Sequence, residues 1–261
     1  MKKMGRTASL LFALFASVPA AASDTTRTML LASLEWLPYV GVGLERQGLS
    51  TFVAEAAAQR IGYRVNVDYF PWTRAMHTGG KDPRYAGYFP AYYTEERARE
   101  CHFSAPIGSS TIGFAHLKSV PLQWSTLNDM GNMKIGVVAG FSNGAEFDAL
   151  AKQGKLNLDA SPSELYNLRK LLAGRIQAVV IDKLILRYLL LTESGLAKGR
   201  ELIVFHERPL AELKLHICFQ RTPEGSALQK AFDKSLQSLS LRSLENDYFQ
   251  RVEKQAARIA R

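Results

Sequence analysis

The chain lacks several features that mark other classes of protein. Its 33 Lys and Arg residues are scattered rather than gathered in a run, so the formal net charge of +9 does not indicate a nucleic-acid-binding protein. Beyond the N-terminal region, no apolar stretch approaches the roughly 18–20 residues that a transmembrane helix needs. Internal repeats and low-complexity tracts are also absent. Because hydrophobic residues make up 47% of the chain, we expect a folded protein with an ample core.

Familiar catalytic and metal-binding motifs are missing as well. The sequence contains no G-x-S-x-G elbow, no P-loop and no H-E-x-x-H. The histidines are scattered, at His77, His102, His116, His206 and His216. His102 directly follows Cys101, but a nucleophilic dyad depends on a geometry that adjacency alone does not provide. We therefore expect no metal, no cofactor and no catalytic residue.

The N-terminus has the three parts of a secretory signal peptide. Lys2, Lys3 and Arg6 form a basic region, residues 10–16 form a short apolar core, and residues 18–23 offer small residues for cleavage. This pattern predicts a signal peptide over residues 1–23 and export, most simply to a bacterial periplasm. An uncleaved anchor is the alternative. About 238 residues then remain, which suits one large domain or two small lobes.

The chain has only two cysteines, Cys101 and Cys218. In an exported protein they would lie in an oxidising compartment, where a disulfide can persist. A possible disulfide requires the fold to bring their Cα atoms within about 7 Å. Two buried, small apolar side chains are the alternative, and the sequence leaves both open.

A first α/β unit follows from the hydrophobic pattern. The predicted elements are strands over 29–34, 63–69 and 85–93, and helices over 49–60 and from Pro71 onward. Gly79-Gly80 indicates a turn after the second helix. The βαβαβ order implies a parallel sheet covered by helices.

The pattern then restarts as a second unit. The predicted elements are strands over 134–138, 177–182, 201–205 and 213–219, helices over 145–153, 165–173 and 184–192, and an amphipathic helical segment over 226–259. Two such units without a flexible linker predict two lobes that share a cleft. We assign residues 24–115 to lobe 1, residues 116–210 to lobe 2, and residues 211–261 to a return into lobe 1.

The expected site lies where strands end. In open α/β sheets, ligands bind beyond the carboxyl ends of the strands. Three such ends are the loop over 33–39, the loop over 140–144 and the turn at Asp182. Their convergence predicts a binding site in the cleft.

One motif carries a specific chemistry. Thr94-x-x-Arg97 is followed by Phe103-Ser104-x-Pro106. An arginine presented in this way can bind a carboxylate through two parallel N–H···O bonds. The alternative is a surface arginine in a charged helical turn.

Together, three motifs give the chain a family resemblance. The Thr-x-x-Arg motif with its Phe-Ser-x-Pro is the first, residues 139–142 (Ala-Gly-Phe-Ser) are the second, and residues 174–182, a Gly-Arg segment ending in Asp182, are the third. Their order resembles the periplasmic solute-binding proteins of family 3, the polar amino-acid type that serves ABC importers. The resemblance extends from Leu30 to about Phe249. It implies an α/β, two-lobed periplasmic-binding-protein-like fold (type II) with the ligand cleft between the lobes.

The resemblance also implies roles for individual residues. The motif arginine, Arg97, would bind the α-carboxylate of the ligand, and Asp182 would bind the α-ammonium from the other lobe. Ser142 would donate to the carboxylate. A buried zwitterion needs both charges paired, which agrees with this arrangement. For Asp182 and Ser142, an N-cap of the following helix is the alternative.

Aromatic residues complete the predicted ligand-binding set. Trp36 and Tyr39 stand where the family places aromatic residues at the first loop of the cleft, and Trp72 follows the second strand. Core packing is the alternative for Trp36 and Trp72, and for Tyr39 it is favoured. Tyr92 and Thr94 precede the motif arginine and are included. This run departs from the family, because Tyr92 is bulky and Pro90 lacks an N–H donor. These changes favour a larger or less polar carboxylate than a standard amino acid.

We therefore expect a monomeric periplasmic protein that captures a small carboxylate or zwitterion for an ABC permease. Two alternatives remain. A few proteins of this fold are dehydratases of prephenate or arogenate, and here Glu35 or Glu146 would have to supply the general acid. The other alternative is a ligand-sensing partner of a membrane receptor.

Overall fold

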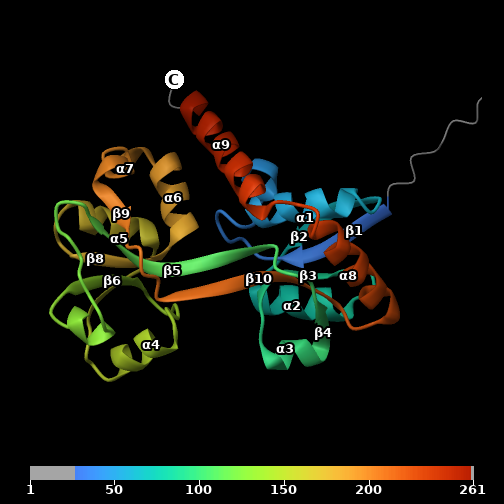
Figure 1. Ribbon diagram of the computed structural model, residues 1–261, viewed down its shortest axis with the longest axis horizontal. Helices are drawn as coiled ribbons and strands as arrows, with labels where there is room; N and C mark the ends of the chain where they lie inside the picture. The colour runs from blue at the N-terminus through green and yellow to red at the C-terminus, as the bar shows by residue number, and fades with distance from the viewer. Residues whose placement is uncertain (1–26, 260–261) are drawn as a thin grey trace, which may run out of the picture.

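The computed structural model describes residues 27–259 of the chain. Two lobes lie side by side and are joined by two long strands, β5 (Gly108–Leu117) and β10 (Ala211–Gln220) (Figure 1). The predicted signal peptide over residues 1–23 lies outside the described residues. Within residues 27–259, no helix has the length and apolar character to cross a membrane.

Most predicted elements form close to their expected bounds. The other strands are β1 (Arg27–Ser33), β2 (Tyr63–Tyr69), β3 (Gly87–Tyr92), β4 (Cys101–Phe103), β6 (Lys134–Val138), β7 (Asn157–Ser161), β8 (Ala178–Asp182) and β9 (Ile203–Phe205). The α-helices are α1 (Leu49–Gln59), α2 (Trp72–Lys81), α3 (Glu95–Glu100), α4 (Ala145–Lys152), α5 (Glu164–Leu172), α6 (Lys183–Thr192), α7 (Gly199–Leu202), α8 (Pro223–Leu236) and α9 (Leu241–Ile259). Short 3-10 helices cover Glu45–Gln47, Leu127–Met130 and Ser194–Leu196.

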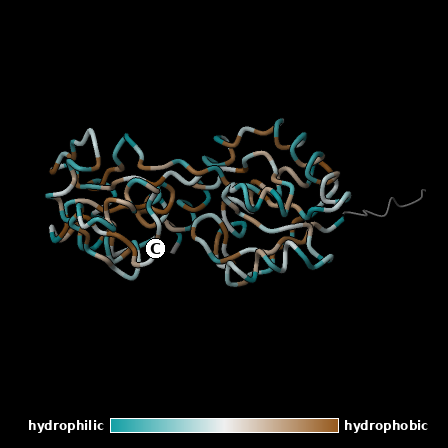
Figure 2. Tube along the Cα trace, turned by 90° about the horizontal axis from the view of Figure 1, so that it is seen from below, coloured by the Kyte–Doolittle hydropathy of each residue, from teal (hydrophilic) through white to brown (hydrophobic). Residues whose placement is uncertain are grey.

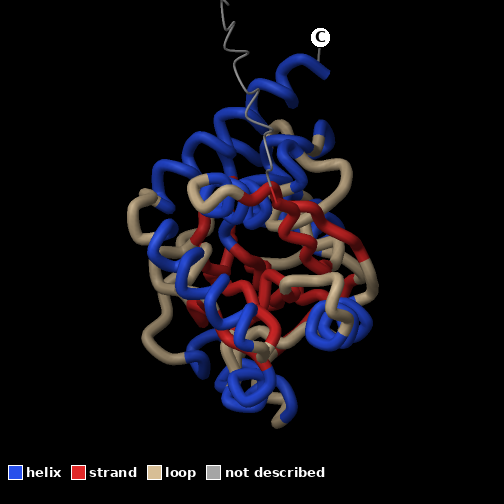
Figure 3. Tube along the Cα trace, turned by 90° about the vertical axis from the view of Figure 1, so that its right-hand side faces the viewer, coloured by secondary structure: helices blue, strands red, loops and turns tan. Residues whose placement is uncertain are grey.

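A continuous sheet runs through both lobes, in the order β2-β1-β3-β10-β5-β8-β6-β7. In one lobe β1 is parallel to β2 and β3, and in the other β6 is parallel to β7 and β8. β10 is antiparallel to β3 and β5, and β5 is antiparallel to β8. Strands lie centrally with helices around them (Figure 3). Each lobe therefore has the parallel α/β core that the sequence predicts, and the expected lobe boundary at residues 115 and 116 falls inside β5.

Separate apolar cores stabilise the two lobes, and apolar stretches occur throughout both of them (Figure 2). In the lobe with β1 to β3, Leu31 and Phe89 pack with Phe232 of α8 and Phe249 of α9. In the other lobe, Phe147 of α4 belongs to a cluster on one side of β6 and β8, and a second cluster fills the side covered by α5. The alternating strand and helix pattern buries these residues, and the loops between elements remain free to form a site.

One predicted turn is wrong for a packing reason. The turn expected at Gly79-Gly80 does not form, because α2 continues through both residues to Lys81. A Cβ atom on Gly79 would lie only 2.5 Å from the carbonyl oxygen of Gly87 in β3. Glycine is needed at position 79 because the helix approaches the strand closely, and not because the chain turns.

Other differences concern short or polar elements. The helical segment predicted over 226–259 is two helices, α8 and α9. The sequence patterns also miss β4, β5 and β7. The first half of β5 reads Gly-Ser-Ser-Thr, and such polar, turn-like residues hide a strand from pattern reading. The strand predicted over 201–205 is reduced to β9 because α7 occupies its first residues.

A disulfide joins Cys101 and Cys218, whose Cα atoms lie 5.5 Å apart. Both cysteines are buried. Cys101 begins β4 directly after α3, and Cys218 lies on the neighbouring strand β10. The crosslink therefore fixes the C-terminal end of α3, the helix that carries Arg97, to the strand that joins the lobes.

The lobes also touch through helices. α9 leaves its own lobe and lies beside α6 of the other (Figure 1). The guanidinium carbon of Arg187 in α6 lies 4.0 Å from the centre of the Phe249 ring in α9. Leu184 of α6 is buried in the same apolar cluster as Phe249. The arrangement of the two lobes thus depends on a helix contact as well as on β5 and β10.

Candidate functional site

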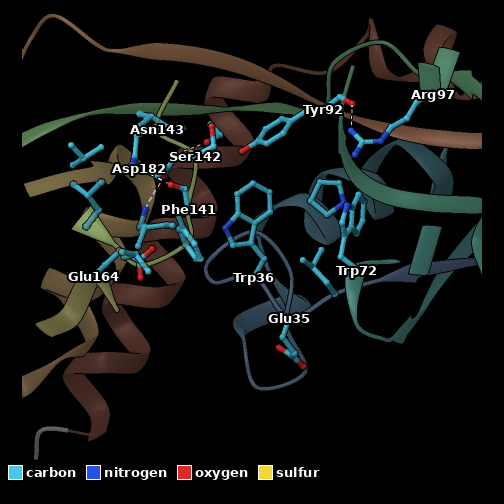
Figure 4. A pocket seen from close by; sticks show the side chains of 18 residues that line it. Glu35, Trp36, Trp72, Tyr92, Arg97, Phe141, Ser142, Asn143, Glu164 and Asp182 are labelled. Atoms are coloured by element: carbon cyan, nitrogen blue, oxygen red, sulfur yellow. Dashed lines mark hydrogen bonds between the residues drawn. The ribbon is translucent and has the colours of Figure 1, made fainter. Parts of the chain in front are cut away.

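A cavity of about 380 Å³ lies between the lobes (Figure 4). Its apolar and aromatic lining residues are Leu34, Trp36, Trp72, Pro90, Tyr92, Ile112, Val138, Phe141, Val180, Ile181 and Ile185. Its polar and charged lining residues are Glu35, Arg97, Ser110, Ser142, Asn143, Glu164 and Asp182. The lining residues come from the loops after β1 and β6 and from the end of β8, as the sequence predicts. Others come from α2, β3, α3, β5, α5 and α6.

The cavity gathers most of the predicted binding residues. Trp36, Trp72, Tyr92, Arg97, Ser142 and Asp182 all line it. Thr94 does not: it is the N-cap of α3, and its hydroxyl accepts a hydrogen bond from the Arg97 N–H at 3.1 Å. The threonine of the Thr-x-x-Arg motif thus begins the helix that presents the arginine. The contribution of these residues to ligand binding stays a prediction.

Arg97 presents a largely unsatisfied guanidinium to the cavity. Its Nη1 donates to the carbonyl oxygen of Tyr92 at 2.9 Å, and its guanidinium carbon lies 5.8 Å from the centre of the Trp72 ring. Among the described residues, no carboxylate forms a salt bridge with Arg97. Since a guanidinium carries five N–H donors in a planar fork, the remaining ones suit a carboxylate.

Asp182 is held by hydrogen bonds on both of its oxygens. Oδ1 accepts from the backbone N–H groups of Leu184 at 2.8 Å and Ile185 at 3.0 Å, so Asp182 is the N-cap of α6. Oδ2 accepts from the hydroxyls of Tyr39 at 2.9 Å and Ser110 at 2.7 Å. Burial raises the pKa of Asp182, and these hydrogen bonds partly oppose the shift. The N-cap alternative therefore describes a real role of Asp182, whatever it binds.

Ser142 is exposed at the cavity and is already engaged as a donor. Its hydroxyl donates to Asp148 of α4, which also accepts the backbone N–H of Asn143 at 2.9 Å. The alternative role of Ser142 as a helix cap is wrong, because Gly144 occupies the N-cap position of α4. A hydroxyl has one hydrogen, so in this geometry Ser142 can only accept from a ligand.

Aromatic rings form much of the wall on the Arg97 side. The ring centres of Trp36 and Tyr92 lie 5.9 Å apart, and those of Trp36 and Tyr39 lie 4.5 Å apart. In Figure 4, Trp36 and Trp72 stand beside each other below Tyr92. Tyr39 packs against Trp36 and is only 1% exposed, which confirms the prediction that it packs in the core. The rings make the wall next to the arginine largely apolar.

Sequence reasoning missed several lining residues. Ser110 lies in the first half of β5, whose polar sequence hides the strand. Glu164 begins α5, which follows β7, another strand that the sequence patterns miss. Phe141 lies in the predicted loop over 140–144 but was not predicted as a binding residue. Phe141 is the aromatic residue of that loop, so including every aromatic residue of a predicted cleft loop would have found it. The residue is 59% exposed.

The remaining charges bear on what the site can do. Of the two glutamates considered for a dehydratase, Glu35 lines the cavity, whereas Glu146 lines a different hollow near Trp124. Among residues 27–259, no group of three or more His, Cys, Asp or Glu side chains could hold a metal ion. The described site therefore offers one guanidinium, three carboxylates and an apolar wall.

Comparisons with known proteins identify the fold. No family model matches the chain, and no curated protein matches it in sequence. Among solved structures, a Bacillus subtilis protein has a TM-score of 0.66 at 18% identity, covering 87% of this chain and 91% of its own. An ancestral cationic amino acid solute binding protein has a TM-score of 0.65 at 14% identity, covering 89% and 96%. A histidine kinase sensor domain with similarity to periplasmic binding proteins has a TM-score of 0.56 at 19% identity, again covering 89% and 96%.

Identities this low show the fold alone. The prediction of an α/β, two-lobed periplasmic-binding-protein-like fold is confirmed. The neighbours also include proteins described as binding amino acids, which agrees with the resemblance to family 3.

Proposed function

We propose that this protein captures a small carboxylate-bearing solute between its lobes and delivers it to an ABC importer, as a divergent member of the family 3 binding proteins. The observation that carries the proposal is Arg97, whose guanidinium lines an aromatic cavity and has donors left for a carboxylate. The resemblance in motif order and the neighbours that bind amino acids add support. Export to the periplasm rests on the predicted signal peptide.

The position of the cavity explains how binding would be signalled. Arg97 lies in one lobe and Ser142 and Asp182 in the other, with β5 and β10 between them. A ligand that contacts both lobes stabilises the closed arrangement by the difference between its affinities for the closed and open states. A permease can then distinguish the loaded protein from the empty one by its shape.

The test is a ligand-dependent rise in melting temperature across a panel of organic acids and amino acids. A ligand at 100 times its Kd adds about 2.7 kcal/mol to the free energy of unfolding, which a melting curve detects. Replacing Arg97 with Ala should raise the Kd of any acid found by about 30-fold or more, because a charge-assisted pair is lost. Arg99→Ala is the matched control, since Arg99 is exposed on the same helix and does not line the cavity. Equal effects of the two substitutions would contradict the proposal.

A second candidate is a ligand-sensing role at a membrane receptor. The similarity to a histidine kinase sensor domain favours it. The cavity and Arg97 would serve in the same way, and only the protein that reads the closed state would differ. Co-purification from membranes with a permease or with a sensor kinase separates the two.

A further inference from the structure

We propose that the ligand is a carboxylate with a flat, apolar body and no ammonium group beside the carboxylate. The inference rests on the proposed function and narrows it. It departs from the role that the family resemblance assigns to Asp182. Three observations carry it: the hydrogen bonds of Asp182, the positions of the other carboxylates, and the lining next to Arg97.

The first observation is that Asp182 has no acceptor position left. A carboxylate offers about four lone-pair sites. The N–H groups of Leu184 and Ile185 take two on Oδ1, and the hydroxyls of Tyr39 and Ser110 take two on Oδ2. All four donors belong to the chain, so an ammonium would have to displace one of them.

The charge of Asp182 is also partly compensated without a ligand. The carboxylate sits at the N-terminus of α6, where the helix dipole and free N–H groups favour a negative charge. Its side chain is buried, with 6% of the residue exposed, and two hydroxyls complete its shell. Asp182 therefore serves to join the Tyr39 loop, β5 and α6, and its hydrogen bonds are complete without a cation.

The second observation is the distance of the other carboxylates from the arginine. An α-ammonium is attached to the carbon next to the carboxylate, so its partner must lie close to Arg97. Figure 4 shows Glu35 and Glu164 projecting well away from Arg97. Glu35 is also exposed and accepts the backbone N–H of Val42 at 3.1 Å. Neither glutamate lies where it would pair with an α-ammonium.

The third observation is the lining next to Arg97. Trp36, Trp72 and Tyr92 lie on the same side of the cavity as the arginine (Figure 4). Pro90 has no N–H, and Leu34 is apolar. An ammonium buried against these groups would gain only the faces of the rings. With no free carboxylate beside it, the loss of its water would still be costly. A planar hydrocarbon or aromatic body, in contrast, packs well against such rings.

Matched pairs of ligands test the inference. Each pair shares one skeleton and differs only in the α-ammonium: 3-phenylpropanoate with L-phenylalanine, indole-3-propanoate with L-tryptophan, and 4-methylpentanoate with L-leucine. We expect the acid without the ammonium to bind at least about tenfold more tightly in calorimetry. Tighter or equal binding of the amino acids would overturn this inference and leave the proposed function standing. If no member of any pair binds at millimolar concentration while another acid of the panel raises the melting temperature, this inference fails and the proposed function stands. If no acid or amino acid of the panel binds, both fail.

A substitution provides the converse test. Ser110→Ala removes one donor from Oδ2 of Asp182 and so frees an acceptor position beside the cavity, which Ser110 lines. We expect the affinity for each amino acid to rise relative to that for its partner acid. Ser235→Ala is the control, because it removes a buried hydroxyl that donates to the carbonyl of Ala57 and not to Asp182. An unchanged ratio in Ser110→Ala, or the same change in both variants, would overturn the role assigned to Asp182.

Discussion

The hydroxyl of Tyr39 donates to Oδ2 of Asp182 at 2.9 Å and thereby joins two residues that are 143 positions apart in the chain. Tyr39 follows β1 in one lobe, and Asp182 ends β8 in the other. The same hydroxyl lies 3.2 Å from the carbonyl oxygen of Ser109 in β5. The contact therefore connects the two lobes at the strand that passes between them, next to the cavity that both lobes line.

This contact predicts a pH dependence of stability. Burial raises the pKa of Asp182 above its ordinary value of 3.8, so between 3.8 and the raised pKa the folded state binds more protons than the unfolded state. The contribution of Asp182 to stability is therefore greatest in acid and falls as the pH rises through that window. Relative to Asp182→Asn, the free energy of unfolding should fall by about 1.4 kcal/mol for each pH unit inside the window.

Urea denaturation of both proteins between about pH 4 and pH 8 measures this difference. Asn at position 182 keeps an oxygen for the N–H groups of Leu184 and Ile185 and has no proton to gain. A difference between the two proteins that stays constant or grows with rising pH would contradict the prediction.

The positions of the tryptophans predict a fluorescence signal for ligand binding. The chain has three tryptophans. Trp36 and Trp72 line the cavity, whereas Trp124 packs against Phe114 with a ring-centre distance of 5.6 Å and does not line it. An acid that binds at Arg97 should therefore change the tryptophan emission of the wild-type protein and of Trp124→Phe alike.

Substitution of the cavity tryptophans supplies the contrast. Trp36→Phe and Trp72→Phe should each lose part of the emission change and raise the Kd of an aromatic acid about two- to tenfold, as expected for weaker ring packing. Fluorescence titration measures both effects. If Trp124→Phe alone abolished the emission change, the ligand would lie outside the cavity described between the lobes.

Local sequence patterns predict most of this fold because most of its elements are strongly patterned. The apolar run at Ile135–Val138 and the alternation over Tyr63–Tyr69 identify strands directly. β5 escapes detection because its first half is polar, and that half supplies Ser110 to the cavity. The polar residues that β5 contributes to the site are therefore also the reason that its hydrophobic pattern does not indicate a strand.

The sequence predicts residues of the site but not the hydrogen bonds that they form. Arg97 and Asp182 could be singled out from motif spacing, and both line the cavity. The hydroxyls that occupy Asp182 could not, because Tyr39 and Ser110 are brought to it by tertiary structure from 143 and 72 positions away. Motif spacing thus indicates which residues line the cavity, whereas the hydrogen-bonding capacity left to each of them depends on contacts that only the fold creates.

The helix contact between the lobes gives the last prediction. Arg187 of α6 lies with its guanidinium carbon 4.0 Å from the centre of the Phe249 ring, and Phe249 of α9 is fully buried. Arg187→Ala should lower the free energy of unfolding by about 0.5–2 kcal/mol, because a cation–π contact and the packing of the arginine stem are lost. Arg242→Ala is the control: Arg242 is exposed on α9, forms no cation–π contact or salt bridge among the described residues, and should change stability by only about 0.5 kcal/mol.

A double-mutant cycle with Phe249→Leu separates the contact from the general effect of losing an arginine. Leucine keeps an apolar side chain in the core but has no ring face for the guanidinium. If the contact between α6 and α9 stabilises the arrangement of the lobes, the two substitutions should be coupled by about 0.5 kcal/mol or more in urea denaturation. Additive effects would mean that α9 packs beside α6 through apolar side chains such as Leu184, without a contribution from the arginine.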